Sequence, residues 1–377
     1  MRSAKLGIVG VGNIGCEHAR LVQTDRVPAM NVVALCGRTI PEEFDVPVFD
    51  EFHEFLQSGL DAVLIATPTM HHVAAAKEAL TAGLHVLVEK PVAMSVAQAH
   101  EVAALVSEGT QCAVMLNQRF NPAYAEIKRL LEQGTIGHVV RYHWTMTHWY
   151  RPDVYYQTSA WRGTWPGEGG GLLINQCIHN LDVLQWWLGL PVRVRSHVAF
   201  GKYHNIEVED EVSVYFEHDN GMTGTLIASS GEAPGYNSLD IVGDQGMIRF
   251  DGDAVYIWRS ESPVSVHRAT TRDMFGTPDF EKERVNLPDM GQQHVQVLNN
   301  FADAILNGVP LLTPFAEGIG SLQLANGILY SAWQDATITL PIAENDFEAM
   351  LQTRIQRSAL RNPAQVDVHI DMDNSFR

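Results

Sequence analysis

The sequence predicts two domains, a doubly wound α/β domain followed by an α+β domain built on a large, mostly antiparallel open β-sheet. The first reason is the length of 377 residues, which exceeds what one ordinary hydrophobic core accommodates. Strand-like and helix-like runs then alternate along the first third of the chain, as in a parallel sheet covered by helices on both faces. Later strand-like runs instead follow one another with turn signals between them. We place the domains at 1–120 and 121–345 and a C-terminal tail at 346–377.

The first domain is predicted from short apolar runs typical of buried strands, which are separated by runs of helical character. Ser95 is a candidate N-cap, and Gly83 and Gly109 are candidate helix ends. The expected strands are residues 5–10, 31–37, 60–69, 85–92 and 111–120, and the expected helices are 15–23, 72–83 and 95–109.

The second domain is predicted from consecutive strands. In one of them Val212, Val214 and Phe216 alternate with polar residues, so one face of the sheet should be buried under helices. The other face is of a kind that serves subunit contact, which favours a homodimer or homotetramer. An amphipathic helix is expected at 294–308, and the tail is charged and less patterned. The expected strands are residues 138–149, 192–200, 210–218, 221–230, 237–250 and 254–258.

Composition excludes several classes of function. A net charge of -18 argues against nucleic acid as a partner, because phosphate contacts need a basic face. No apolar run reaches the roughly 18 residues of a membrane-spanning helix. The opening "MRSAKLGIVGVG" enters a strand instead of forming a signal region, so we expect a cytoplasmic protein. The four cysteines form no CxxC pair and the histidines show no metal-ligand spacing, so no metal site is expected.

A glycine-rich turn, Gly10-Val11-Gly12-Asn13-Ile14-Gly15, joins the first predicted strand to the first predicted helix. Gly10 permits a tight turn, Gly12 lets the backbone approach a pyrophosphate, and Gly15 lets helix and strand pack closely. Free N–H groups at the helix N-terminus attract phosphate. In this position the motif predicts a dinucleotide-binding Rossmann domain, with Asn13 and Ile14 in the binding turn. The alternative is a glycine-rich turn without a ligand.

The end of the second predicted strand bears on the choice of dinucleotide. An NAD site usually places a carboxylate there to hold the ribose 2′-hydroxyl. This chain instead has Cys36-Gly37-Arg38-Thr39, and a guanidinium and a hydroxyl suit a 2′-phosphate. The sequence therefore favours NADP slightly over NAD. Arg38 in a solvated turn, or stacked on adenine without choosing a cofactor, is the alternative.

Motifs in a fixed order along nearly the whole chain, about residues 4–342, resemble those of the Gfo/Idh/MocA oxidoreductases, a family named for glucose–fructose oxidoreductase and inositol dehydrogenase. The resemblance implies a cofactor-binding domain, a substrate domain, and an activity on sugars, sugar derivatives or cyclitols. The motifs are the glycine turn, "IATPTMHH" at 65–72, "VLVEKP" at 86–91, "NQRFNP" at 117–122, "WRGTW" at 161–165, "GGGLLINQCIHNLD" at 169–182 and "FADAILNG" at 301–308.

The catalytic residues that this resemblance implies are Lys90, His179 and Asn175. Lys90 follows a strand at its C-terminal end, where ligands gather in a doubly wound sheet. Its implied role is to contact the substrate oxygen that gains or loses a proton. His179 falls on the family's acid/base position, and an imidazole with an ordinary pKa of about 6.5 suits that task. Asn175 stands where many members carry aspartate. It lies one turn before His179 on an expected helix that also places Asp182 on this stripe.

Further site residues follow from the same motifs. Besides the glycine turn and Arg38 and Thr39, the cofactor-binding residues implied are Thr67, Pro68, His72, Glu89, Lys90, Gln118, Trp161 and Arg162. The substrate-binding residues implied are Lys90, Asn175, His179, Tyr156 and His294. The expected activity is that of an NAD(P)-dependent dehydrogenase with a sugar or polyol as substrate. Two alternatives on the same architecture are a regulator that binds cofactor and sugar without turnover, and an NAD-dependent glycosidase.

Overall fold

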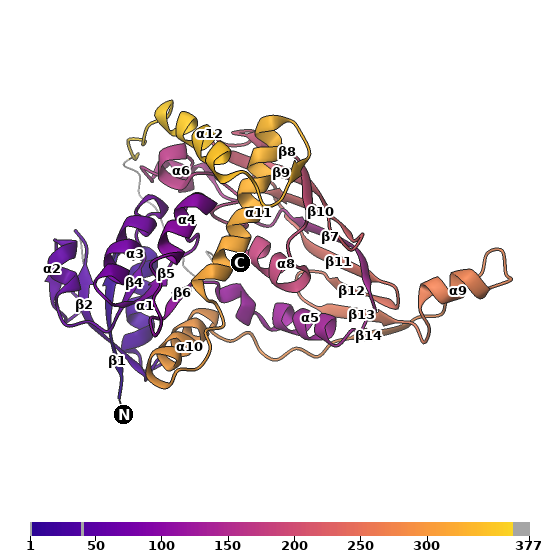
Figure 1. Cartoon of the computed structure of the whole chain (residues 1–377), viewed down its shortest axis with the longest axis horizontal. Helices are drawn as coiled ribbons and strands as arrows, with labels where there is room; N and C mark the ends of the chain where they lie inside the picture. The colour runs from indigo at the N-terminus through magenta and orange to yellow at the C-terminus, as the bar shows by residue number, and fades with distance from the viewer. Residues whose placement is uncertain (1, 39–40, 365–377) are drawn as a thin grey trace.

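The computed structural model describes residues 2–38 and 41–364. Within these ranges six parallel strands form one sheet in the order β3-β2-β1-β4-β5-β6. Helices flank the sheet, so the expected doubly wound domain is confirmed (Figure 1). Its strands are β1 (Ala4–Val9), β2 (Met30–Cys36), β3 (Val48–Phe49), β4 (Ala62–Ile65), β5 (His85–Val88) and β6 (Cys112–Val114). Its helices are α1 (Asn13–Gln23), α2 (Phe52–Leu56), η1 (Thr69–His71), α3 (His72–Thr81) and α4 (Val96–Ala103), with η2 (Asn117–Phe120) after β6.

The second sheet has nine strands in the described ranges, in the order β14-β13-β12-β11-β7-β10-β9-β8-β15. Only β7 and β10 pair in parallel there, so the mostly antiparallel sheet is also confirmed. Val212, Val214 and Phe216 of β9 are buried as expected. The strands are β7 (Val139–Met146), β8 (Arg193–Phe200), β9 (Glu209–Glu217), β10 (Thr223–Ser229), β11 (Asn237–Gly243), β12 (Gly246–Phe250), β13 (Val255–Arg259), β14 (Glu281–Arg284) and β15 (Ile338–Thr339).

The remaining helices are α5 (Pro122–Glu132), α6 (Asp153–Gln157), α7 (Trp165–Glu168), α8 (Ile178–Leu188), α9 (Val264–Thr270), α10 (Gln293–Asn307), α11 (Phe315–Gln334) and α12 (Glu344–Gln356). Helix α11 joins the two domains, because it packs against α4 and β6 on one side and against α8 and β8 on the other (Figure 1). This contact holds the carboxyl ends of the parallel strands beside the start of α8, where the site lies.

Several predicted elements in the first domain are shorter than expected, among them the strands at 60–69 and 85–92, which form only β4 and β5. The strand predicted at 111–120 ends at Val114, and the chain then forms η2, which carries the buried Arg119 toward Asp182 of the second domain. The helix predicted at 95–109 begins after Ser95, as expected. The Ser95 hydroxyl caps it by accepting a hydrogen bond from the backbone N–H of Gln98. The helix ends at Ala103, because the residues that follow would extend it without burying an apolar stripe.

Two helices late in the chain correct the predicted domain limits. Helix α10 lies against the first domain, since Leu298 and Phe301 pack into the cluster formed by β1 and α1 (Figure 1). The chain therefore returns to the Rossmann domain after leaving it. The segment predicted as a charged, less patterned tail at 346–377 is helical in its first part, because α12 buries Phe347 and Leu351 and stacks Phe347 on Trp333 of α11. Residues 365–377 lie outside the described ranges.

Candidate active site

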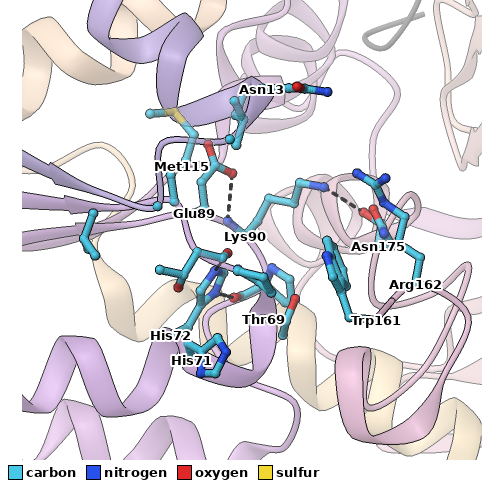
Figure 2. Close-up of a pocket in the computed structure, with 18 of the residues that line it drawn as sticks. Asn13, Thr69, His71, His72, Glu89, Lys90, Met115, Trp161, Arg162 and Asn175 are labelled. Atoms are coloured by element: carbon cyan, nitrogen blue, oxygen red, sulfur yellow. Dashed lines mark hydrogen bonds between the residues drawn. The ribbon is translucent and has the colours of Figure 1, made fainter. Parts of the chain in front are cut away.

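A cavity of about 860 Å³ lies between the two domains at the carboxyl ends of the parallel strands. Ligands of doubly wound proteins bind at this edge of the sheet. The glycine turn lines one end of the cavity, and Lys90, Asn175 and His179 line it together. Figure 2 shows Lys90 extending from its loop across the cavity toward Asn175, with Trp161 and Arg162 beside it.

The glycine turn has the geometry that phosphate binding needs. Gly10 has a φ of +89°, and a Cβ there would lie 2.5 Å from the Thr67 amide nitrogen. A Cβ on Gly15 would lie 2.1 Å from the Gly10 carbonyl oxygen, so helix and strand approach as closely as predicted. At Gly12, by contrast, nothing in the described chain lies within 4 Å of a Cβ. No described side chain caps the N-terminus of α1 there, so its N–H groups are left for an anion.

The end of the cavity next to the carboxyl end of β2 contains two opposite charges. Arg38 lines the cavity as predicted, while the predicted Thr39 lies outside the described residues. Asp50 lines the same cavity after β3, and the sequence analysis missed it. It is not the first carboxylate after β2. The feature that could have indicated Asp50 is its position directly after β3, the strand that follows β2. Because β3 pairs with β2, Asp50 lies close to Cys36 at the end of β2.

His72 ties two loops of the cavity together. Its Nδ1 lies 2.8 Å from the Pro91 carbonyl oxygen and its Nε2 lies 2.8 Å from the Thr67 carbonyl oxygen. The ring is buried, and burial lowers the pKa of His72 although both carbonyl contacts oppose this. His72 therefore holds the Thr67-Pro68 loop against the loop that carries Lys90.

Glu89 lies beside Lys90 on the first-domain wall. Its Oε1 is 2.6 Å from Nε2 of the fully buried His18, and its Oε2 accepts a hydrogen bond from the Lys90 amide (Figure 2). Burial alone would raise the pKa of Glu89, but the His18 contact and the nearby His294 and Lys90 hold it at about 2. His294 lines the cavity next to His18, and burial lowers its pKa to about 4. No motif in the sequence pointed to His18, which lies inside α1.

Lys90 connects the two walls. Its Nζ donates a 3.0 Å hydrogen bond to the backbone carbonyl oxygen of Asn175 (Figure 2). Burial lowers the pKa of Lys90, with Glu89 and Glu168 acting in the opposite direction. The ammonium is thus held at the place where the two domains meet.

His179 lies in the first turn of α8 and lines the cavity. Burial, and then the charge of Lys90, lower its pKa well below 6.5. Asn175 lies in the turn before α8 instead of on the helix itself, because α8 begins only at Ile178. Asp182 does not share the cavity-facing stripe, since it forms a buried ion pair of 2.7 Å with Arg119.

The aromatic wall of the cavity differs from the prediction at one position. Trp161 and Arg162 line the cavity as expected, and the Arg162 guanidinium lies 4.4 Å from the centre of the Tyr155 ring. Tyr155, not Tyr156, lines the cavity. Neighbouring residues of the short helix α6 point in different directions, and the buried Tyr156 packs instead against His204 at a ring distance of 4.9 Å.

Gln118 and His294 line the cavity as predicted, with Pro68, Thr67 and His72. The buried Glu168 was not among the predicted site residues. It accepts a hydrogen bond from the side-chain amide nitrogen, Nδ2, of Asn175. Its only sequence signal was an acidic residue directly before three glycines. Among the described residues no group of three or more His, Cys, Asp or Glu side chains is arranged to hold a metal ion. Within the same ranges no helix has the length and apolar character to cross a bilayer.

The cavity fits a dinucleotide on two observations. The open face of Gly12 and the uncapped N-terminus of α1 provide the place for a pyrophosphate. Several buried polar atoms of cavity-lining residues have no hydrogen-bond partner in the described chain, as expected where a polar ligand supplies the missing partner. They are Thr67 Oγ1, Asn117 Oδ1, Arg162 Nε and His179 Nδ1.

Comparison with known proteins agrees with this geometry. Residues 4–118 match the family model described as "Oxidoreductase family, NAD-binding Rossmann fold", and residues 124–249 match the "GFO/IDH/MocA C-terminal domain". The scyllo-inositol 2-dehydrogenase (NAD(+)) of Bacillus subtilis is 27% identical over 82% of this chain and 88% of its own length. The scyllo-inositol 2-dehydrogenase (NADP(+)) IolW of the same organism is 23% identical over 89% and 96%, respectively.

A solved structure shows the same architecture. The WlbA dehydrogenase from Bordetella pertussis, in complex with NADH and UDP-GlcNAcA, superposes with a TM-score of 0.77 at 25% sequence identity. The match covers 90% of this chain and 100% of that one. Fold and site together define an NAD(P)-dependent dehydrogenase. The chain belongs to the GFO/IDH/MocA family, which confirms the resemblance drawn from its motifs, and NAD or NADP is its cofactor.

Proposed function

We propose that this protein catalyses reversible hydride transfer between nicotinamide and a secondary alcohol carbon of a cyclitol, sugar or sugar derivative. The observation that carries the proposal is the meeting of Lys90, Asn175 and His179 in the cavity that begins at the glycine turn. The inositol dehydrogenases among the relatives support the substrate class.

His179 is the proposed acid/base. Its pKa lies well below 6.5, so the ring is neutral at pH 7 and can accept the hydroxyl proton of the alcohol during oxidation. A nicotinamide bound in the cavity would supply the acceptor for the hydrogen of the same carbon, which leaves with its electron pair. Together these two transfers leave a ketone and a protonated His179. In the reverse direction the imidazolium returns the proton to the carbonyl oxygen.

Lys90 is proposed to stabilise negative charge on the reacting oxygen. Its ammonium is buried and held by the Asn175 carbonyl, so it needs little reorganisation as an alkoxide develops. Asn175 is proposed to bind a substrate hydroxyl through its amide. Trp161, with the Tyr155 ring that the structure adds, provides flat apolar surfaces suited to the carbon faces of a ring. His294 is proposed as a further substrate contact.

The class of reaction is tested with a panel of inositols, aldoses and ketoses in the presence of NAD or NADP, followed by absorbance of the reduced nicotinamide. We expect turnover with at least one ring polyol. The Lys90→Met variant should lose roughly a hundredfold in kcat, because one charge that stabilises the transition state is removed. Tight cofactor binding without turnover of any polyol or ketose would reject the proposal.

The choice between NAD and NADP is proposed to depend on Arg38 and Asp50. Arg38 favours a 2′-phosphate, and Asp50 suits a 2′-hydroxyl and repels a phosphate. We expect Asp50→Asn to shift the ratio of affinities toward NADP and Arg38→Ala to shift it toward NAD, each by roughly tenfold. Titration of each variant with both reduced cofactors by fluorescence measures the ratio. If both variants keep the wild-type ratio, neither residue contacts the 2′ position.

A further inference from the structure

Glu168 is a buried carboxylate that stands directly against a side chain of the active site. It ends helix α7 and is 2% exposed. Asn175 lines the cavity, whereas Glu168 does not. The Glu168 side chain therefore acts on the cavity through its hydrogen bond with the side-chain amide of Asn175.

The hydrogen bonds around Glu168 allow the side-chain amide of Asn175 to adopt only one orientation. Glu168 Oε2 accepts from the Gly163 amide at 2.6 Å, and Oε1 accepts from Asn175 Nδ2 at 2.5 Å. The second N–H of the same amide is directed to the Tyr155 hydroxyl at 3.3 Å. Because both N–H groups of Asn175 are engaged, its carbonyl Oδ1 is the atom left for the cavity. A carboxylate is an acceptor only, so it cannot pair with Oδ1.

We propose that Glu168, as a carboxylate, is a positioning residue that turns the Asn175 carbonyl oxygen into the cavity, where it accepts a hydrogen bond from a substrate hydroxyl. This inference rests on the proposed function, because it assigns the substrate side of the same site. It adds a residue that acts on the reaction through another and never touches the substrate.

The proposal implies that protonation of Glu168 reverses the amide. A protonated Oε1 donates a hydrogen bond, so Asn175 has to present Oδ1 to it and direct its N–H groups away. Burial raises the pKa of Glu168 to about 7, although the Gly163 and Asn175 hydrogen bonds and the charges of Arg162 and Lys90 lower it. The charged and titratable groups that interact with Glu168 are Lys90, Arg162, Glu209 and Tyr156.

The Glu168→Gln variant tests the orientation. A glutamine there can satisfy Gly163 only with its oxygen, so its NH₂ group faces Asn175 and draws Oδ1 away from the cavity. We expect kcat to fall about ten- to a hundredfold, the size of one lost hydrogen bond, while the affinity for the reduced cofactor stays the same. Wild-type kcat should also fall with acid through an apparent pKa near 7, and this step should be absent in Glu168→Gln.

The exchange of the two groups gives the sharper result. Asn175→Asp alone places two carboxylates in contact, which have to share a proton, and activity should fall. In the double variant Glu168→Gln/Asn175→Asp the glutamine NH₂ donates to the new aspartate, which keeps an oxygen toward the cavity. We expect it to recover most of the lost kcat. A double variant at or below the product of the two single effects would overturn the proposal, as would Glu168→Gln with wild-type kcat and pH profile.

Thermal unfolding of the same four proteins makes the test independent of catalysis. Asn175→Asp should lower Tm, and adding Glu168→Gln should restore it, because one carboxylate of the pair is removed. Glu209→Gln is the matched control, since Glu209 is equally buried but accepts from the Gly171 and Leu173 amides instead of Asn175. It should not rescue Asn175→Asp. If the wild type turns over no polyol, the proposed function fails, but the Tm values of the four proteins still test the contact between Glu168 and Asn175. Coupled Tm changes support this pairing, and additive changes reject it.

Discussion

Two buried glutamates flank the active-site cavity and behave in opposite ways: Glu89 lines its first-domain wall, and Glu168 lies behind Asn175 of its second-domain wall. On the first-domain wall Glu89 faces the imidazole of His18, and its pKa is held at about 2. Behind the second-domain wall Glu168 faces a neutral amide and a backbone N–H, and burial raises its pKa to about 7. The depth of burial is similar, so the partner decides whether the charge persists.

The difference gives the walls separate tasks. The first-domain wall keeps the negative charge of Glu89 in the cavity over the whole physiological pH range. The second-domain wall contains His179, whose pKa is lowered well below 6.5 by burial, and behind Asn175 lies Glu168, whose pKa is raised by burial to about 7. Lys90 belongs to the first wall by sequence but ends on the second, at the Asn175 carbonyl. We infer that proton transfer takes place at the second wall and that the first wall supplies fixed electrostatics.

The largest expected effect comes from replacing His179. If the second wall carries out proton transfer, His179→Asn should lower kcat by roughly 10²- to 10⁴-fold, the usual contribution of a general acid/base, with little change in cofactor affinity. Steady-state kinetics and fluorescence titration of the reduced cofactor measure the two effects. His143→Asn is the control, since His143 lies on the exposed face of β7 and bonds Thr225. A similar loss in both variants would assign the effect to folding.

The constant charge of Glu89 predicts a pH-dependent contribution to the stability of the fold. A carboxyl whose folded pKa is lowered from 4.5 to about 2 adds stability above pH 4.5, and this stability is lost as the pH falls toward 2. Replacing Glu89 by Gln should therefore lower the free energy of unfolding by about 3 kcal/mol at pH 7. The difference from wild type should shrink below pH 4.5.

Urea unfolding at pH 7, 4.5 and 3 measures this difference. Glu101→Gln is the matched control, because Glu101 pairs with Lys77 on the surface. An exposed ion pair contributes less than about 1 kcal/mol. A Glu89→Gln effect that stays constant across these pH values would show that the carboxylate of Glu89 is not what stabilises this wall.

The first wall was largely predictable from the sequence, because its chemistry is local. Gly10, Gly12 and Gly15 act within one turn, and Lys90 follows its own strand, so short motifs contain the information. The exceptions are contacts between distant segments. His18 meets Glu89 across 71 positions of the sequence, and Asp50 reaches the cavity only because β3 pairs with β2. Neither partner can be found from spacing.

The second wall was predictable in its landmarks and less so in its details. His179 and Trp161 were placed at the cavity by motif. The sequence predicts Tyr156 at the substrate, whereas Tyr155 lines the cavity, because the orientation of a short helix depends on what it packs against. The role of Glu168 follows from the fold of the turn at 169–177, which brings it against Asn175, and no pattern of residue types encodes that contact.

The smallest expected effect concerns Gly12, and it tests whether the first wall binds the cofactor through its backbone. At a φ of -84° an alanine there adopts the same backbone without strain, and its methyl group would meet nothing in the described chain. Gly12→Ala should therefore leave Tm unchanged. The methyl group would occupy the space in front of the α1 N-terminus, so affinity for the reduced cofactor should fall by roughly tenfold, about 1.4 kcal/mol. Gly291→Ala, at a position with only ordinary contacts, is the control and should change neither quantity. Unchanged cofactor affinity in Gly12→Ala would place the pyrophosphate elsewhere.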